Sequence, residues 1–271
     1  MLRSLQQNKR NTLALLVGTL LAFSPLTALA QDAAQKGLEI ATRSDNSDNG
    51  FGDSTANAIM VLTNTAGQSS SRELRFMTLE RASANVGDKT ISLFLTPADV
   101  KGTAVLSHAK ITANDDQWIY LPALKRVKRI SSSNKSGPFM GSEFAYEDIT
   151  AQELGKFTYT WIRSEKCGSA TCDVIERIPT YKKSGYSRQL VWINSKTLQA
   201  ETVQFFDRAG NHVKTMTSSG WKKYSGYWRQ ASLTMVNHRN GKSTVLKFSN
   251  WKFKTGLTDR DFKSTALQNL R

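Results

Sequence analysis

Hydrophobic and polar residues alternate with a period of two along most of the chain after Ser54. Because successive side chains of a strand point to opposite faces, this alternation predicts β-strands. The predicted strands fall into two series, separated by a stretch without alternation. They are Thr55–Asn64, Arg72–Arg81, Thr90–Thr96, Thr103–His108, Gln117–Leu121 and Val127–Ile130, then Lys156–Glu165, Cys172–Pro179, Ser187–Asn194, Ala200–Asp207, His212–Gly220, Tyr227–Asn237 and Ser243–Trp251.

Turn-forming residues separate many of these strands, for example in Asn64-Thr65-Ala66-Gly67 and Arg239-Asn240-Gly241. Short strands at this spacing indicate an antiparallel meander or barrel. Helical spacing is found in 32–43, where Gly37 weakens the pattern, and in Thr258–Leu270, where Thr258 is expected to cap a short helix.

Several predicted strands are apolar on both faces. In Thr55–Asn64, Ile59 and Val61 point one way while Met60 and Leu62 point the other. An antiparallel sheet with two apolar faces needs a cover on both sides, and the few predicted helices can cover only one. The other face must close on itself, dimerise or hold an apolar ligand. A plain β-sandwich core is the alternative.

The first thirty residues have the pattern of a secretory signal peptide. Residues 1–30 contain three basic residues and no acid, an apolar run at Leu13–Phe23, and an Ala28-Leu29-Ala30 end. We therefore expect cleavage after Ala30, export to the periplasm, and a single domain over 31–271. The alternative is an uncleaved membrane anchor. Removal of the segment lowers the net charge from +15 to +12.

Two cysteines, Cys167 and Cys172, are present in this exported chain. Their spacing differs from that of a thioredoxin-type pair, and no histidine nearby completes a zinc site. An oxidising compartment favours a disulfide that closes a hairpin, with a pair of free thiols as the alternative.

Four cations gather in and beside one predicted strand, at Lys125, Arg126, Lys128 and Arg129. Strand alternation places them on both faces, which is typical of an exposed edge strand. They form either a contact site, which would bind anionic head groups or the acidic surface of a partner, or simply a solvated edge.

The segment Ser131–Asp148 that follows is rich in Ser and Gly, yet it contains Phe139, Met140, Phe144 and Tyr146. Apolar side chains in such a loop indicate binding or a lid over apolar surface. The alternative is a loop whose aromatic residues plug the end of a barrel.

The sequence gives little support for catalysis. The histidines His108, His212 and His238 lack metalloprotease spacing, and no nucleophile elbow is present. The pairs Asp115-Asp116 and Glu147-Asp148 are adjacent acids of a kind common in turns. We expect no enzyme, no cofactor and no metal site. Export and the lack of a recognised motif also argue against nucleic acid as a partner.

The segment Trp118–Asp148 (WIYLPALKRVKRISSSNKSGPFMGSEFAYED) resembles the signature of the LolA-like outer-membrane lipoprotein-sorting proteins, in their longer subfamily. Asn49–Phe76 and Trp251–Leu267, with GLTDRDF, match the order and spacing of the same family. The resemblance implies a mainly β (α+β) fold. This is an incomplete antiparallel β-barrel with a few short helices over its concave face and an apolar pocket for acyl chains.

The resemblance implies a periplasmic carrier that shuttles a lipid or acylated, lipoprotein-like cargo between envelope membranes. The four cations would then contact head groups, an anionic membrane surface or a partner. Relatives in this subfamily are associated with inner-membrane exporters of the RND type, so a non-carrier accessory protein docked on such an exporter is the alternative. An envelope hydrolase ranks last. The candidate ligand-binding residues are Phe76, Trp118, Tyr120, Phe139, Met140, Phe144 and Tyr146.

Overall fold

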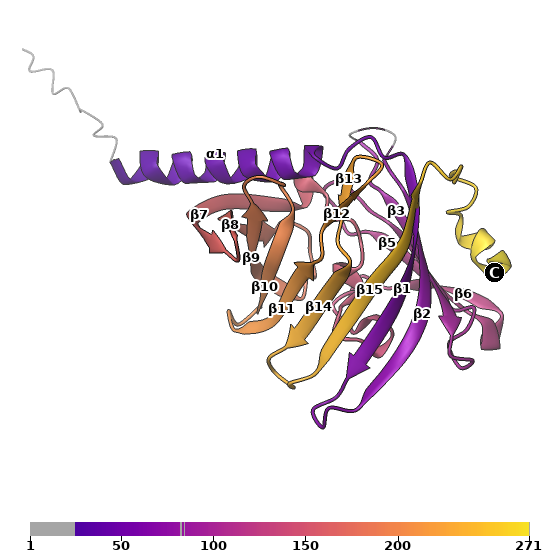
Figure 1. Ribbon diagram of the computed structural model, residues 1–271. Coiled ribbons are helices and arrows are strands. Elements are labelled where there is room, and N and C mark those ends of the chain that lie inside the picture. Colours follow the sequence, from indigo (N-terminus) through magenta and orange to yellow (C-terminus); the bar gives the residue numbers. More distant parts are fainter. Residues whose placement is uncertain (1–24, 82, 84, 271) are drawn as a thin grey trace, which may run out of the picture.

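A curved, open sheet of thirteen antiparallel strands forms the body of the protein (Figure 1). The computed structural model describes residues 25–81, 83 and 85–270, so residues 1–24 of the predicted signal peptide lie outside the described part. The strand order is β6-β5-β4-β3-β2-β1-β15-β14-β11-β10-β9-β8-β7. The strands are β1 Asp53–Thr63, β2 Ser69–Leu79, β3 Lys89–Thr96, β4 Ala104–His108, β5 Asp116–Leu121, β6 Arg126–Ile130, β7 Phe157–Cys167, β8 Ala170–Pro179, β9 Tyr186–Asn194, β10 Ala200–Asp207, β11 His212–Ser219, β14 Ser232–Asn237 and β15 Ser243–Phe253.

The predicted mainly β fold with an incomplete barrel is confirmed, and each predicted strand overlaps an observed one. The prediction of one strand over Tyr227–Asn237 is wrong. The chain forms a small hairpin of β12 (Lys222–Tyr224) and β13 (Tyr227–Arg229) and then starts β14. Arg229 at the end of β13 packs against the rings of Phe51 and of Phe253 on β15 and pairs with Asp48 at 2.5 Å, which fixes this hairpin as a separate element beside the main sheet.

Two meanders make up the sheet. The strands β1 to β6 form one, and β7 to β15 form the other, with the β12–β13 hairpin set aside. They join only where β1 pairs with β15, for example at Met60 opposite Leu246. Strands β6 and β7 are therefore successive strands of the chain that lie at opposite edges of the sheet.

The chain between these two edge strands, residues 131–156, crosses the concave face, and we call it the cover segment. It contains three short 3-10 helices, η2 Phe139–Gly141, η3 Tyr146–Asp148 and η4 Leu154–Lys156. A further 3-10 helix, η1 Pro122–Leu124, lies between β5 and β6. The cover segment supplies Phe139 and Phe144 to the larger hydrophobic cluster, whose other members come from both meanders and from helix α1 (Pro25–Asn46).

A smaller hydrophobic cluster lies on the other face of β2 to β5. Met77, Ile91 and Leu106 pack there against Phe262 and Leu267 of the C-terminal segment. That segment contains the 3-10 helix η5 (Ser264–Asn269). The two apolar faces of these strands are thus covered by different parts of the chain, the cover segment inside and the C-terminal segment outside (Figure 1).

Other apolar positions on the outer face are treated differently. Ile59 on β1 is 46% exposed, so that face of the strand has no cover. Phe206 on β10 lies under the guanidinium of Arg188, 3.6 Å from the ring centroid.

The predicted helix cap at Thr258 is wrong. The Thr258 hydroxyl donates to Asp261, and the 3-10 helix of this segment starts later, at Ser264.

Helix α1 is longer than the predicted 32–43 and includes the predicted cleavage point after Ala30. It lies along β7 (Figure 1), where Ile40 and Ala41 enter the larger cluster. A Cβ at Gly37 would stand 2.6 Å from the backbone nitrogen of Trp161. Gly37 therefore permits the contact between helix and strand. Within the described residues, no helix is long and apolar enough to cross a membrane.

We predict that Gly37→Ala destabilises the protein by about 1–3 kcal/mol through overpacking against β7. In an isolated helix the same change is stabilising by about 1 kcal/mol, so the sign of the effect identifies the close contact. Urea unfolding measures it, with Arg43→Ala on the exposed side of α1 as control. A Gly37→Ala variant more stable than wild type would contradict this packing.

Candidate functional site

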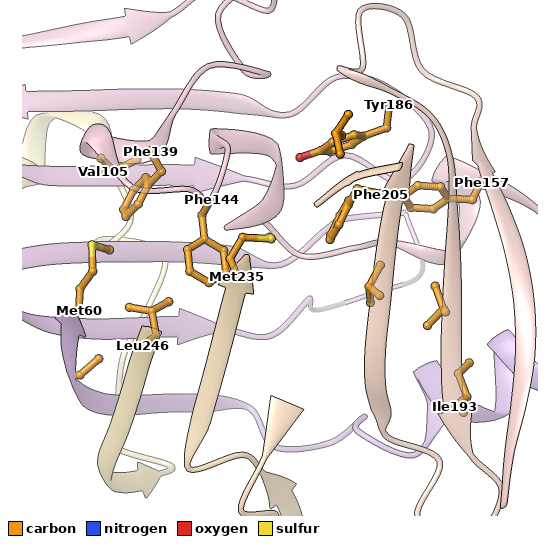
Figure 2. Packing of buried hydrophobic residues seen from close by; sticks show 14 of the residues in the cluster. Met60, Val105, Phe139, Phe144, Phe157, Tyr186, Ile193, Phe205, Met235 and Leu246 are labelled. Atoms are coloured by element: carbon orange, nitrogen blue, oxygen red, sulfur yellow. The ribbon is translucent and has the colours of Figure 1, made fainter. Parts of the chain in front are cut away.

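The larger cluster gathers on the concave face, and two aromatic rings of the cover segment lie at its centre. Phe139 and Phe144 are both fully buried. Figure 2 shows both rings among side chains of the sheet, including Met60, Met235 and Leu246. The Phe139 amide donates to the Phe144 carbonyl at 2.7 Å, so the two rings are carried by one tight turn.

Buried polar contacts anchor this turn on its C-terminal side. Glu147 Oε2 accepts hydrogen bonds from the Tyr181 hydroxyl at 3.0 Å and the Ser184 hydroxyl at 2.9 Å. Its Oε1 accepts from the Gly185 amide at 2.8 Å. A buried carboxylate is costly without partners, and here three donors stabilise it. Glu147 thus ties the cover segment to the chain that leads into β9.

Asp148 is the second anchor. Its Oδ2 accepts from the Ala145 amide at 2.7 Å and the Tyr186 hydroxyl at 3.0 Å, and it lies 3.9 Å from the Lys214 ammonium. Burial raises the pKa of this carboxyl to about 6, against the lowering effect of Lys214. Asp148 therefore joins the cover segment to β9 and β11.

The ends of the cover segment are fastened by ion pairs. Buried Lys156 pairs with Asp115 at 2.5 Å, and buried Lys135 donates to the carbonyl of Asp115. Near the same end as Lys156, Arg81 of the chain after β2 pairs with Glu153 at 3.0 Å. The same guanidinium contacts Asp45 of α1 at 2.7 Å, so it also holds the helix.

The turn itself is held by β2 and β15. Arg72 donates to the Met140 carbonyl at 2.5 Å, and the Glu143 amide donates to the Thr244 hydroxyl at 3.0 Å. Met140 has a φ of +50°, a left-handed conformation that is uncommon outside glycine. These contacts fix the aromatic turn at a point where its backbone is unfavourable.

A hollow of about 740 Å³ opens beside the cover segment, at the rim formed by the β10–β11 and β14–β15 turns. Tyr186 and Val213, both members of the larger cluster, line its inner side. The ring of Tyr186 packs against Phe205, with centroids 4.8 Å apart. The apolar interior and the rim are thus contiguous.

The structure divides the sequence-predicted ligand residues between the two faces of the sheet. Phe139 and Phe144 lie within the larger cluster, and Met140, Tyr146 and Phe76 pack against it. Trp118 and Tyr120 lie on the opposite face, against the smaller cluster. Strand alternation places both on the face away from the cover segment, together with Leu106 and Phe262.

The four predicted contact cations lie together, at an edge of the sheet. Arg126, Lys128 and Arg129 belong to β6, an edge strand, and Lys125 precedes it with a φ of +48°. All four side chains are exposed. Arg129 pairs with Asp116. The other three have no ion-pair partner among the residues that the structure describes.

The cysteines and histidines considered in the sequence make contacts within the fold. Cys167 and Cys172 form a disulfide at the end of the β7–β8 hairpin. His108 contacts the Phe262 carbonyl at 2.8 Å, while His212 and His238 share the hydroxyl of Thr215. The described residues contain no cluster of three or more metal-ligating side chains.

The sequence does not reveal the buried carboxylates that anchor the cover segment. Glu147-Asp148 and Asp115-Asp116 have the pattern of ordinary turn pairs, although Glu147 is 6% exposed and Asp148 has only 2% of its side chain exposed. Adjacent acids in a segment with buried aromatic residues were the available signal. Their partners come from strands and turns far along the chain, which no local pattern shows.

Comparisons with known proteins support this description. A crystallised domain from Vibrio parahaemolyticus, which its description assigns to outer membrane lipoprotein-sorting proteins, is 47% identical over 87% of this chain and 99% of its own, with a TM-score of 0.84. A DUF1329 family protein from Desulfovibrio piger is 30% identical over the same shares, with a TM-score of 0.82. A LolA superfamily protein from Nitrosomonas europaea has the same fold, with 19% identity over 86% of this chain and 97% of its own and a TM-score of 0.64.

A protein-family model described as "Uncharacterized protein" matches residues 87–269. No curated protein matches the chain. The descriptions of the three similar structures name no catalytic activity. Its fold is LolA-like. On the strength of the two relatives that span nearly all of the described residues, the chain belongs to the family of the Vibrio parahaemolyticus outer membrane lipoprotein-sorting protein domain and the Desulfovibrio piger DUF1329 protein.

Proposed function

We propose that the protein is a periplasmic carrier that holds the acyl chains of a lipid or lipoprotein-like cargo against the concave face of its sheet. The observation that carries this proposal is that a loop supplies the two central aromatic rings of the core. Phe139 and Phe144, at the centre of the apolar concave face, come from a loop that crosses it, and no strand supplies them. A loop can leave such a face while the sheet stays intact.

In this proposal the two rings occupy the place that an acyl chain takes when cargo is bound. Each buried CH₂ group stabilises the bound state by about 0.8 kcal/mol, which offsets the burial lost when the rings leave. Met140, Tyr146 and Phe76 border the same space and would contact the chain. Trp118 and Tyr120 on the opposite face would contribute to stability only.

Movement of the cover segment requires its anchors to yield. Asp148 is the most sensitive of them, because its carboxylate is buried and its ion-pair partner among the described residues, Lys214, is as far away as 3.9 Å. Since burial raises its pKa to about 6, the carboxylate is charged at neutral pH at an energetic cost. The charged anchor therefore holds the cover less firmly than the protonated one.

The cations at Lys125, Arg126, Lys128 and Arg129 would engage an anionic membrane surface or an inner-membrane RND-type exporter during loading or release. They are exposed on the edge strand that leads into the cover segment, so docking there would leave the concave face itself free. An accessory protein that docks through this edge and carries nothing is the competing function. It predicts no uptake of lipid.

We predict that Phe144→Ala strengthens binding of a phosphatidylcholine with a fluorescent acyl chain, although it lowers stability by about 3–5 kcal/mol. The matched control is Phe262→Ala, which empties an equally buried position on the opposite face. It should cost similar stability and leave binding unchanged. Fluorescence titration measures binding, and Phe144→Leu gives a milder version. Absence of lipid binding by the wild-type protein would refute the carrier function.

Neutralisation of the edge cations, with Lys125→Gln, Arg126→Gln, Lys128→Gln and Arg129→Gln together, should weaken sedimentation with anionic vesicles and leave the melting temperature nearly unchanged. Exposed charges contribute little to folding, whereas each Lys or Arg near an anionic surface contributes about 1 kcal/mol to attraction. If the variant binds vesicles as the wild type does, these cations are only solvated side chains of an edge strand and have no role in binding.

Asp148→Asn should remove one component of the pH dependence of stability. A folded-state pKa of about 6 lies above the ordinary 3.8, so the folded protein binds this proton more tightly than the unfolded chain. The resulting stability is full below about pH 4 and is lost as pH rises through 6. Relative to the variant, wild type should lose about 1–3 kcal/mol over this window in urea unfolding.

The control for this measurement is Asp99→Asn, on an exposed turn between β3 and β4. This control reports what the loss of one exposed negative charge does to the measurement. A pH-dependent difference for Asp148→Asn no larger than that of the control would contradict the prediction.

A further inference from the structure

The rim hollow collects positive charge that no continuous segment of the sequence carries. Four of its lining residues are cations, Lys183, Arg208, Lys214 and Arg239, and one is an acid, Asp207. They come from four places, the chain before β9, the β10–β11 turn, strand β11 and the β14–β15 turn. The order of the strands in the sheet brings these places together.

The cations are positioned in different ways. The Nε and Nη2 groups of Arg208 both donate to the Ser184 carbonyl, at 3.0 and 2.8 Å, which orients the guanidinium and leaves further donors available. Lys214 lies 3.3 Å from the Tyr186 hydroxyl. Lys183 is exposed, has a φ of +68°, and has no ion-pair partner among the described residues.

The acids nearby neutralise only part of this charge. Asp207 accepts the amides of Ala209 and Asn211 at 2.9 Å each and pairs with Arg239, so its oxygens are already engaged. Its pKa is lowered, chiefly by the hydrogen bond from the Asn211 backbone. Asp148 lies below Lys214. Glu143 accepts from the Asn237 side chain at 2.6 Å.

An apolar wall completes the pocket. Tyr186 and Val213 line the hollow and also belong to the larger cluster. A molecule bound here would place a charged group among the cations, and a chain attached to that group would meet the apolar interior directly. This juxtaposition suits a ligand with one anionic end and one apolar end.

We propose that the rim pocket lined by Lys183, Arg208, Lys214 and Arg239 binds the anionic head group, a phosphate or carboxylate, of an amphiphilic cargo. The inference rests on the carrier function proposed above and adds the chemical class of the cargo to it. Acyl chains bind beneath the cover segment, and the head group stays at the rim. The pocket therefore favours acidic lipids over zwitterionic lipids with the same chains.

The test compares two probes that share one fluorescent acyl chain, phosphatidylglycerol and phosphatidylcholine. The rim variant combines Lys183→Gln, Arg208→Gln and Arg239→Gln and keeps Lys214, which lies beside the Asp148 anchor. It should bind phosphatidylglycerol about tenfold more weakly than wild type does, as expected for several solvent-accessible ion pairs. Its affinity for phosphatidylcholine should change by less than about twofold. The single variant Lys183→Asn, whose side chain tolerates a positive φ, should show a smaller loss in the same direction.

The matched control removes the same charge elsewhere, with Lys101→Gln, Lys166→Gln and Lys222→Gln at exposed positions outside the pocket. It should bind both lipids as wild type does. If the control and rim variants lose affinity for phosphatidylglycerol equally, the loss comes from net charge alone, and the proposal is overturned. Unchanged binding of phosphatidylglycerol by the properly folded Lys183→Asn and rim variants would also overturn it.

Inorganic phosphate separates a lipid head group from a free anion. We expect millimolar phosphate to displace phosphatidylglycerol only weakly, because it lacks the acyl chain. Binding of phosphate as tight as that of the lipid would make the pocket a site for free anions and overturn the proposal. Failure of the wild-type protein to bind either lipid would refute the carrier function itself, whereas binding of both lipids with equal affinity would refute the head-group site alone.

Discussion

The placement of β6 and β7 at opposite edges of one open sheet is the constraint on which the rest of the structure depends. The chain between them must cross the sheet, and residues 131–156 do so inside the concave face. A backbone laid through an apolar interior must have its polar groups satisfied. The Phe139 amide donates to the Phe144 carbonyl, the Glu147 amide to the Lys135 carbonyl and the Ala145 amide to the Asp148 carboxylate, which are contacts of the kind this requirement calls for. The same crossing brings Phe139 and Phe144 into the core, so one segment both closes the molecule and occupies its candidate binding site.

Two kinds of interaction hold that segment, and they differ in how they respond to a ligand. The aromatic rings are held by burial, which an acyl chain reproduces when it takes their place. The carboxylate anchors are held by directed hydrogen bonds, which an acyl chain cannot replace. The Arg81 guanidinium adds a link from the cover segment to α1. In the proposed exchange of rings for cargo, Lys135 and Lys156 would keep the two ends of the segment attached while the aromatic turn and its Asp148 anchor move, so the moving part would be small.

The alternation of apolar residues predicts the sheet well, since the period of two survives in almost every strand. It also predicts two covered faces, and Phe262 and Phe144 show that both exist on β2 to β5. It fails at Tyr227–Asn237, where packing of Arg229 among aromatic rings overrides the local pattern. In the sequence, Gly37 looks like a weakness of α1. The backbone of Trp161, which leaves no room for a side chain there, lies far along the chain. The rim cations and the buried acids escape prediction for the same reason: each is isolated in sequence and acquires partners only through the strand order.

The pairing of β1 with β15 has a consequence for how the protein forms. Each meander consists of hairpins or near neighbours, whereas this seam joins residues such as Ser54 and Phe253. Closing so long a loop is slow and entropically costly. The two meanders are therefore expected to form early and to dock late. Until β15 is available, β1 remains an unpaired edge of eleven residues, open to pairing with another chain. Because synthesis runs from the amino end, this edge stays unpaired until the last strand has been made, so assembly depends on the arrival of β15.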